Sequence, residues 1–168
     1  MDELSALTMQ QINLAERLGA ALQQKGMLLA LAESCTGGMV AQAVTSIAGS
    51  SAWFDRGFVT YSNDAKIEML DVSQQTLNQC GAVSEETAKE MAEGAIKHSH
   101  ATISGSITGI AGPTGGSNEK PVGTVCFAWN LENKCLVSAT KHFQGSRQEI
   151  RTQATSALLE GLLNLLRD

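Results

Sequence analysis

The sequence predicts an α/β protein built as a three-layer α/β/α sandwich around a mixed sheet. Segments with helical and with strand-like apolar spacing alternate along most of the chain, which favours parallel strands joined by helices. Two strand-like segments then follow one another, with a turn near residues 132–133, so an antiparallel hairpin should complete the sheet. The 168 residues are 43% hydrophobic and carry a formal net charge of -5. We therefore expect one domain over residues 1–168.

The first half of the chain gives a local signal for each expected element. Leu14, Leu18 and Leu22 recur at helical spacing within a predicted helix over residues 11–24. A continuous apolar run over 27–32 is typical of a strand buried on both faces. The next expected elements, in order, are a polar loop over 33–38, a helix over 40–47, a strand over 56–61 and a short helix over 64–70.

In the second half, capping residues mark the helices most clearly. Ser84 is a favourable N-cap for a helix over 85–96, which carries one apolar stripe. Ser146 and Glu149 have the spacing of a capping box and should open the last helix. Between these helices we expect a strand over 102–108, a Gly/Pro loop over 109–116, and hairpin strands over 123–129 and 135–143.

The composition argues against several classes of function. The four cysteines are scattered without a CxxC pair, which disfavours a zinc site and a disulfide framework, and we expect reduced thiols, no metal and no cofactor. The twelve basic residues are dispersed, which disfavours binding to nucleic acid. No apolar run is long enough to span a membrane, and the first residues are acidic where a secretory signal is basic. We therefore expect a cytoplasmic protein with no membrane contact.

The loop over residues 33–38 joins a buried strand to a helix, and its sequence admits two interpretations. Backbone N–H groups at a helix N-terminus attract an anion or a developing oxyanion, so Ser34, Thr36, Gly37 and Gly38 are candidate site residues. Alternatively, Ser34 and Thr36 cap the helix while the two glycines allow close packing. The spacing alone does not decide between catalysis and structure.

A second glycine-rich loop, over residues 109–116, also follows a buried strand. Its backbone N–H groups could surround a phosphate, although the segment has no GK[ST] ending and is not a Walker motif. A plain surface turn is the alternative. Arg147 is expected at the first position of the last helix, where a cation opposes the helix dipole, and Arg151 follows on the same face. A ligand phosphate would explain this placement, but a solvated arginine is the commoner case.

Ser50, Ser51, Tyr61 and Lys66 lie close together in the sequence and could form a catalytic group. A lysine whose pKa is lowered can act as the base for a serine hydroxyl, and a tyrosine hydroxyl can assist. Burial, or a neighbouring cation such as Arg56, would have to lower that pKa from about 10.4. Alternatively, Lys66 is solvated and Tyr61 packs at the sheet edge. A Ser-His-Asp triad is disfavoured because two of the three histidines, His98 and His100, fall at the polar end of a helix.

Several long segments resemble one known family. They are AESCTGG at residues 32–38, AGSSAWFDRGFVTYSNDAK at 48–66, GAVSEET at 81–87, SITGIAGPTGGSNEKPVGTV at 106–125 and FQGSR at 143–147. Together they resemble the C-terminal domain of the competence/damage-inducible protein CinA, and within that family the stand-alone nicotinamide-nucleotide amidases. The resemblance covers nearly all of the chain beyond the first helix.

The resemblance implies an amidohydrolase that converts nicotinamide mononucleotide to nicotinate mononucleotide and ammonia. Because Ser51, Tyr61 and Lys66 match the family's central motif, it implies Ser51 as nucleophile, Lys66 as its base and Tyr61 as an assisting hydroxyl. Ser34 is the competing nucleophile; otherwise it would hold the carboxamide with Thr108. The expected phosphate-binding residues are Arg147 and the loop that contains Gly112, Gly115 and Gly116.

Two other kinds of function remain open at this stage. The first is a non-catalytic module that binds a pyridine nucleotide, which would keep the phosphate-binding residues without needing Lys66. The second is a regulatory partner of recombination or DNA-uptake proteins, which only the family's name suggests and which the acidic composition disfavours. A homodimer is a further expectation from the resemblance.

Overall fold

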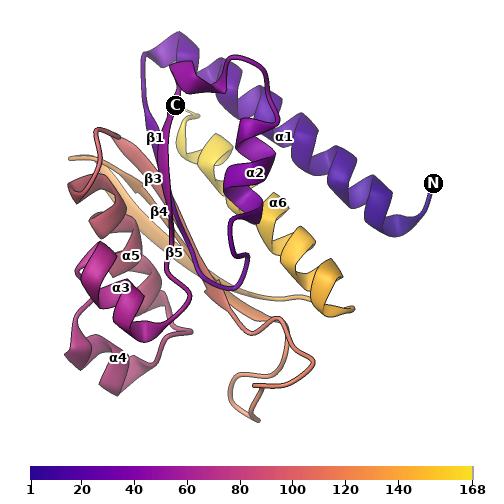
Figure 1. Ribbon diagram of the computed structural model, residues 1–168, viewed down its shortest axis with the longest axis vertical. Helices are drawn as coiled ribbons and strands as arrows, with labels where there is room; N and C mark the ends of the chain where they lie inside the picture. Colours follow the sequence, from indigo (N-terminus) through magenta and orange to yellow (C-terminus); the bar gives the residue numbers. More distant parts are fainter. Residues whose placement is uncertain (168) are drawn as a thin grey trace.

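A computed structural model describes residues 1–167 as a five-stranded sheet with helices on both faces (Figure 1). The elements in chain order are α1 (Glu3–Lys25), β1 (Leu29–Glu33), α2 (Met39–Thr45), the 3-10 helix η1 (Ser50–Ala52), β2 (Phe54–Val59), α3 (Asn63–Leu70), α4 (Gln74–Cys80), α5 (Glu85–Lys97), β3 (Ile103–Gly109), β4 (Thr124–Leu131), β5 (Cys135–His142) and α6 (Arg147–Leu165). The strand order across the sheet is β2-β1-β3-β4-β5.

The sheet combines parallel and antiparallel strands. β1 pairs in parallel with both β2 and β3, whereas β4 is antiparallel to β3 and β5 is antiparallel to β4. The predicted mixed sheet and its closing hairpin are therefore confirmed. Because β1, β2 and β3 run in the same direction, the segments that follow them all leave from one edge of the sheet, where ligands bind in folds of this class.

Each face of the sheet is covered by its own group of helices. Figure 1 shows α1, α2 and α6 on one face and α3, α4 and α5 on the other, which confirms the predicted three-layer sandwich. The larger apolar core, which includes Leu18, Phe127 and Leu158, lies under α1 and α6, and a second cluster includes Leu70 and Met91. β1 is buried along its whole length between these layers, which explains its continuous apolar sequence.

Some elements differ from the sequence-based expectation. α1 begins at Glu3, about two turns before the first apolar stripe, because the Asp2 side chain caps it by accepting the Ser5 N–H at 2.8 Å. The short helices η1 and α4 were not expected, since each has too few residues to show an apolar period. The capping box of Ser146 and Glu149 is confirmed at the start of α6.

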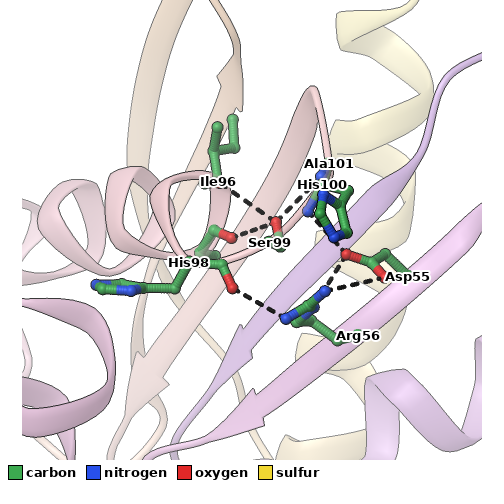
Figure 2. A network of polar contacts seen from close by, with 8 residues as sticks. Asp55, Arg56, Ile96, His98, Ser99, His100 and Ala101 are labelled. Carbon is green, nitrogen blue, oxygen red and sulfur yellow. Dashed lines mark hydrogen bonds and ion pairs between the residues drawn. The ribbon is translucent and has the colours of Figure 1, made fainter.

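The beginning of β2 is tied to the α5–β3 connection by the polar network that Figure 2 shows. The Asp55 carboxylate accepts the His100 N–H at 2.9 Å, and this hydrogen bond is the main reason that the pKa of Asp55 is lowered. Arg56 bonds to Asp55 at 2.9 Å and donates to the His98 carbonyl oxygen at 3.2 Å. This network lies at the opposite sheet edge from the ends of the parallel strands.

The structure describes the helix hydrophobicity, the thiols and the possible metal ligands to which the composition pointed. No helix within residues 1–167 is long and apolar enough to cross a membrane. Cys35, Cys80, Cys126 and Cys135 are all free thiols. Among the same described residues, no three His, Cys, Asp or Glu side chains come together as a metal site would require.

The contact of α5 with α3 gives a test of the packing. A Cβ added at Gly94 would run into the backbone of Leu70. Although alanine favours a helix over glycine by about 1 kcal/mol, overpacking of this kind costs about 1–3 kcal/mol. We predict that Gly94→Ala lowers the free energy of unfolding, measured by urea denaturation. The exposed neighbour substitution Glu93→Ala should change it by less than about 0.5 kcal/mol, and a stabilised Gly94→Ala protein would contradict the packing.

Candidate active site

A polar cavity of about 180 Å³ lies at the edge of the sheet where β1, β2 and β3 end. Ser34 and Cys35 follow β1, Tyr61 and Asn63 follow β2, and Thr108 is near the end of β3. The complete lining is Ser34, Cys35, Tyr61, Asn63, Lys66, Ala82, Val83, Thr108, Gly109, Ala111 and Arg147. Larger hollows exist elsewhere on the surface, but this one collects the serine, lysine and arginine that the sequence singled out.

Ser34 and Lys66 form a direct pair within this cavity. The Lys66 Nζ lies 2.9 Å from the Ser34 Oγ, although 32 positions separate the two residues in the sequence. The same Nζ lies 2.9 Å from the Thr60 carbonyl oxygen and 3.4 Å from that of Tyr61. Lys66 is only 1% exposed, and so its amino group is held in one place by three oxygen atoms.

The surroundings of Lys66 favour the neutral form of its amino group. Burial lowers the pKa of Lys66, and the nearby Cys35 opposes this effect. No carboxylate within residues 1–167 forms an ion pair with Lys66. A neutral amine has two N–H donors and one lone pair, which matches two carbonyl oxygens and one serine hydroxyl. The pair is therefore arranged for transfer of the Ser34 proton to Lys66.

A buried carboxylate holds the loop that carries Ser34. Glu33 is fully buried, and its side chain accepts the Thr36 hydroxyl at 2.7 Å. It also accepts backbone N–H groups from the start of α2, at 3.2 Å from Gly38, 3.0 Å from Val40 and 3.0 Å from Ala41. Glu33 thus caps α2 with its own negative charge and uses N–H groups that the sequence had suggested for a ligand.

The mouth of the cavity is crossed by Arg147, from the first turn of α6. Its guanidinium donates to the Gly112 carbonyl oxygen at 2.7 Å and to the Tyr61 hydroxyl at 3.2 Å. Both partners are neutral, so the positive charge of Arg147 is not paired with an acid here. An exposed guanidinium without an acidic partner suits a ligand phosphate.

Two further polar side chains complete the lining. The Thr108 hydroxyl donates to the Ala82 carbonyl oxygen at 2.9 Å, which ties the end of β3 to the segment before α5. Asn63 opens α3 one turn before Lys66 and forms no side-chain hydrogen bond with another residue in 1–167. Its amide therefore remains able to bind a ligand in the cavity.

Comparisons with known proteins identify the family of this chain. The family model described as "CinA C-terminal domain" matches residues 11–166. The chain belongs to the CinA C-terminal domain family. It is 53% identical over 150 residues to the nicotinamide-nucleotide amidohydrolase PncC of Enterobacter agglomerans, covering 89% of this chain and 92% of that protein. The resemblance that the sequence motifs suggested is therefore confirmed.

Further relatives support the same assignment. PncC of Escherichia coli strain K12 is 52% identical over 151 residues, which cover 90% of this chain and 92% of the relative. The crystal structure of the competence/damage inducible protein CihA from Agrobacterium tumefaciens superposes with a TM-score of 0.92 at 46% identity, covering 94% of this chain and 96% of that one.

In this CinA domain the expected pairing of Ser51 with Lys66 is wrong. Ser51 is exposed in η1, just before β2 begins, whereas Lys66 follows the end of that strand. The six residues of β2 place the two ends about 20 Å apart. The competing nucleophile, Ser34, occupies the position beside Lys66. Tyr61 reaches Lys66 through its carbonyl oxygen, while its 63% exposed side chain lies at the mouth with Arg147.

Some of the predicted binding residues line the cavity, and others lie outside it in the loops that surround it. Thr108 and Arg147 line the cavity, whereas Thr36, Gly37 and Gly38 do not. Thr36 is fully buried against Glu33, and both glycines have positive φ angles, 55° and 104°, that the turn into α2 requires. Gly112, Gly115 and Gly116 lie outside the lining; only the carbonyl oxygen of Gly112 approaches it, through Arg147.

Three charged residues have contacts that differ from those expected from the sequence. Arg56 is engaged at the opposite sheet edge, so burial rather than this cation lowers the pKa of Lys66. Glu33 was read as part of a polar loop; an acid directly before a helix start was the available signal for its capping role. Arg151 donates to the backbone of the Ser34 loop at 3.1 Å and 3.0 Å, which only the folded chain reveals.

The capping role of Glu33 can be tested through stability. Glu33→Ala would remove the acceptor of one buried and two partly buried N–H groups, and a buried group left unsatisfied costs about 1–3 kcal/mol. We predict a loss of about 3 kcal/mol or more in the free energy of unfolding, measured by urea denaturation. Glu16→Ala, at an exposed position of α1, is the matched control and should change it by less than about 0.5 kcal/mol. A loss at Glu33 as small as that of the control would contradict the role.

Proposed function

We propose that this protein is a nicotinamide-nucleotide amidohydrolase, which hydrolyses nicotinamide mononucleotide to nicotinate mononucleotide and ammonia. The observation that carries the proposal is the buried Ser34–Lys66 pair, with 2.9 Å between Oγ and Nζ. A serine with a neutral lysine as its base is an attested arrangement for acyl transfer. The identity of the substrate rests on the PncC relatives, which are 52–53% identical to this chain over most of their length.

In the first half of the reaction, Ser34 is the nucleophile and Lys66 is its base. The Ser34 Oγ attacks the carboxamide carbon while its proton moves to the Lys66 Nζ. Backbone N–H groups of the loop after Ser34 stabilise the negative oxygen of the tetrahedral intermediate. As this intermediate collapses, Lys66 returns the proton to the leaving nitrogen, so ammonia departs and an ester on Ser34 remains.

In the second half, water replaces ammonia at the same position. Lys66 takes a proton from the attacking water, and the ester carbonyl is again polarised by the backbone N–H groups. Collapse of the second intermediate breaks the bond to Ser34 Oγ, which regains a proton from Lys66. Nicotinate mononucleotide is then released. No step calls for a metal or an organic cofactor, and we keep the prediction that none is needed.

The cavity is large enough for only part of the substrate. About 180 Å³ is less than the roughly 300 Å³ at which pockets for whole drug-sized ligands begin, so only the pyridine carboxamide enters. The ribose phosphate then lies at the mouth, where Arg147, which contacts the Gly112 carbonyl oxygen, binds the phosphate. A contribution from the loop of Gly112, Gly115 and Gly116 stays a prediction. Thr108 and Asn63 line the same cavity, and we assign them to the carboxamide end.

The remaining expectations accompany this proposal as predictions. We expect a homodimer in the cytoplasm, acting on a small molecule without contact to nucleic acid or a membrane. The formal net charge of -5 agrees with the expected lack of nucleic-acid binding.

The choice of nucleophile gives the first functional prediction. Ser34→Ala should lower kcat for ammonia release from nicotinamide mononucleotide by about 10³-fold or more, because both covalent steps are lost. Ser51→Ala is the matched control, and its kcat should stay within about twofold of wild type since Ser51 is exposed at the far end of β2. The reverse pattern, in which Ser51→Ala loses its kcat and Ser34→Ala keeps it, would overturn the assignment.

The lowered pKa of Lys66 predicts the pH dependence of the reaction. Only the neutral amine accepts the serine proton, and its fraction grows as pH rises through the pKa of Lys66. Since burial lowers this pKa, kcat/KM should rise with pH along a limb whose midpoint lies below about 10.4. Lys66→Arg should be nearly inactive over the same range because guanidinium stays protonated. A pH-independent rate, or an active Lys66→Arg enzyme, would contradict the role of Lys66 as base.

The position of Arg147 at the mouth predicts an effect on substrate binding. A charge-assisted hydrogen bond to the phosphate contributes about 1.5–3 kcal/mol, so Arg147→Ala should raise KM by roughly tenfold to a hundredfold. Its kcat should change little because the phosphate is remote from the reacting carbon. Steady-state kinetics with nicotinamide mononucleotide measures both constants, and a fall in kcat with unchanged KM would refute this role.

A further inference from the structure

Arg151 contacts the loop that carries Ser34, but it is not among the residues that line the cavity. From α6, its Nε donates to the Cys35 carbonyl oxygen at 3.1 Å and its Nη2 to the Thr36 carbonyl oxygen at 3.0 Å. One edge of the guanidinium therefore binds two consecutive peptide groups, Cys35–Thr36 and Thr36–Gly37. A lysine cannot reproduce this contact because its single nitrogen lacks the planar fork.

These contacts fix the direction of a backbone N–H group beside the nucleophile. In a planar trans peptide the C=O and N–H point in opposite directions, so a Cys35 C=O held by Arg151 turns the Thr36 N–H away from Arg151. Ser34 opens the turn, since the Gly37 N–H donates to its carbonyl oxygen at 3.0 Å. In such a turn the first residue's side chain lies on the side of the N–H groups two and three positions later.

The Thr36 N–H also has no acceptor in another residue. Within residues 1–167 it donates to no other residue, although Thr36 is fully buried. The Cys35 N–H, by contrast, contacts its own thiol. A buried N–H without an acceptor costs about 1–3 kcal/mol, which is relieved when an oxyanion binds there. In other serine hydrolases the N–H after the nucleophile commonly serves this purpose.

We propose that Arg151 is a positioning residue, which holds the Cys35–Thr36 peptide so that the Thr36 N–H faces the oxyanion formed at Ser34. This inference rests on the proposed amidase function. Glu33 holds the same loop from the α2 side through the Thr36 hydroxyl. The loop is therefore fixed by a carboxylate on one side and by the Arg151 guanidinium on the other. Arg147 and Arg151, one turn apart on α6, thus have separate tasks: the first binds substrate and the second orients the backbone.

The test compares Arg151→Lys and Arg151→Ala with Arg17→Lys, the same conservative change at an exposed site of α1. Loss of one oxyanion donor costs about 10²–10³-fold in kcat, so both Arg151 variants should lose roughly 10²-fold while KM stays within about twofold. Added guanidinium at low millimolar concentration should restore part of the kcat of Arg151→Ala. Arg17→Lys should match wild type.

Three outcomes would overturn the proposal. They are a wild-type kcat in Arg151→Lys, a raised KM with unchanged kcat, and a lowered kcat that follows a loss of thermal stability and does not respond to guanidinium. A fluorophosphonate probe, which labels activated serines, separates this idea from the substrate assignment. If wild type is labelled at Ser34, and Arg151→Lys much more slowly, the positioning role holds even when nicotinamide mononucleotide yields no ammonia. In that case the proposed function fails.

Discussion

The Lys66 amino group is buried beside Ser34 and two carbonyl oxygens, and no acid pairs with it within residues 1–167. Burying an amine is unfavourable for its charged form, so burial lowers the pKa of Lys66. The rest of the site depends on this arrangement. β1 ends directly before Ser34, and β2 leads into α3, where Lys66 lies in the first turn. The parallel pairing of these strands therefore brings the two residues together.

The loop after β1 shows how the same feature can be structural and catalytic. A helix N-terminus attracts anions, but here Glu33 occupies the first N–H groups of α2. One step earlier, the Thr36 N–H donates to no other residue within 1–167, and the proposed mechanism assigns it to the oxyanion. Within this one loop, some N–H groups are capped by Glu33, and the proposed mechanism uses another for catalysis.

The sequence predicted the layers, the mixed sheet and the closing hairpin because these follow from local apolar spacing and capping residues such as Ser84 and Ser146. It misassigned the partner of Lys66 because Ser51 is nearer in the chain, although a whole strand separates them in space. Contacts between distant segments, such as Arg151 with the Ser34 loop, 115 and 116 positions apart, leave no local pattern. Family motifs pointed to Ser51, Ser34, Lys66 and Arg147 as candidates but could not state which side chains touch.

The account depends most on a covalent intermediate at Ser34. The direct measurement is mass spectrometry of the enzyme quenched with acid during turnover of nicotinamide mononucleotide, followed by peptide mapping. The proposed mechanism predicts a nicotinate mononucleotide ester on the peptide that contains Ser34, absent from the Ser34→Ala protein. An ester on the peptide that contains Ser51, or steady ammonia release with no ester under conditions where its hydrolysis limits the rate, would contradict it.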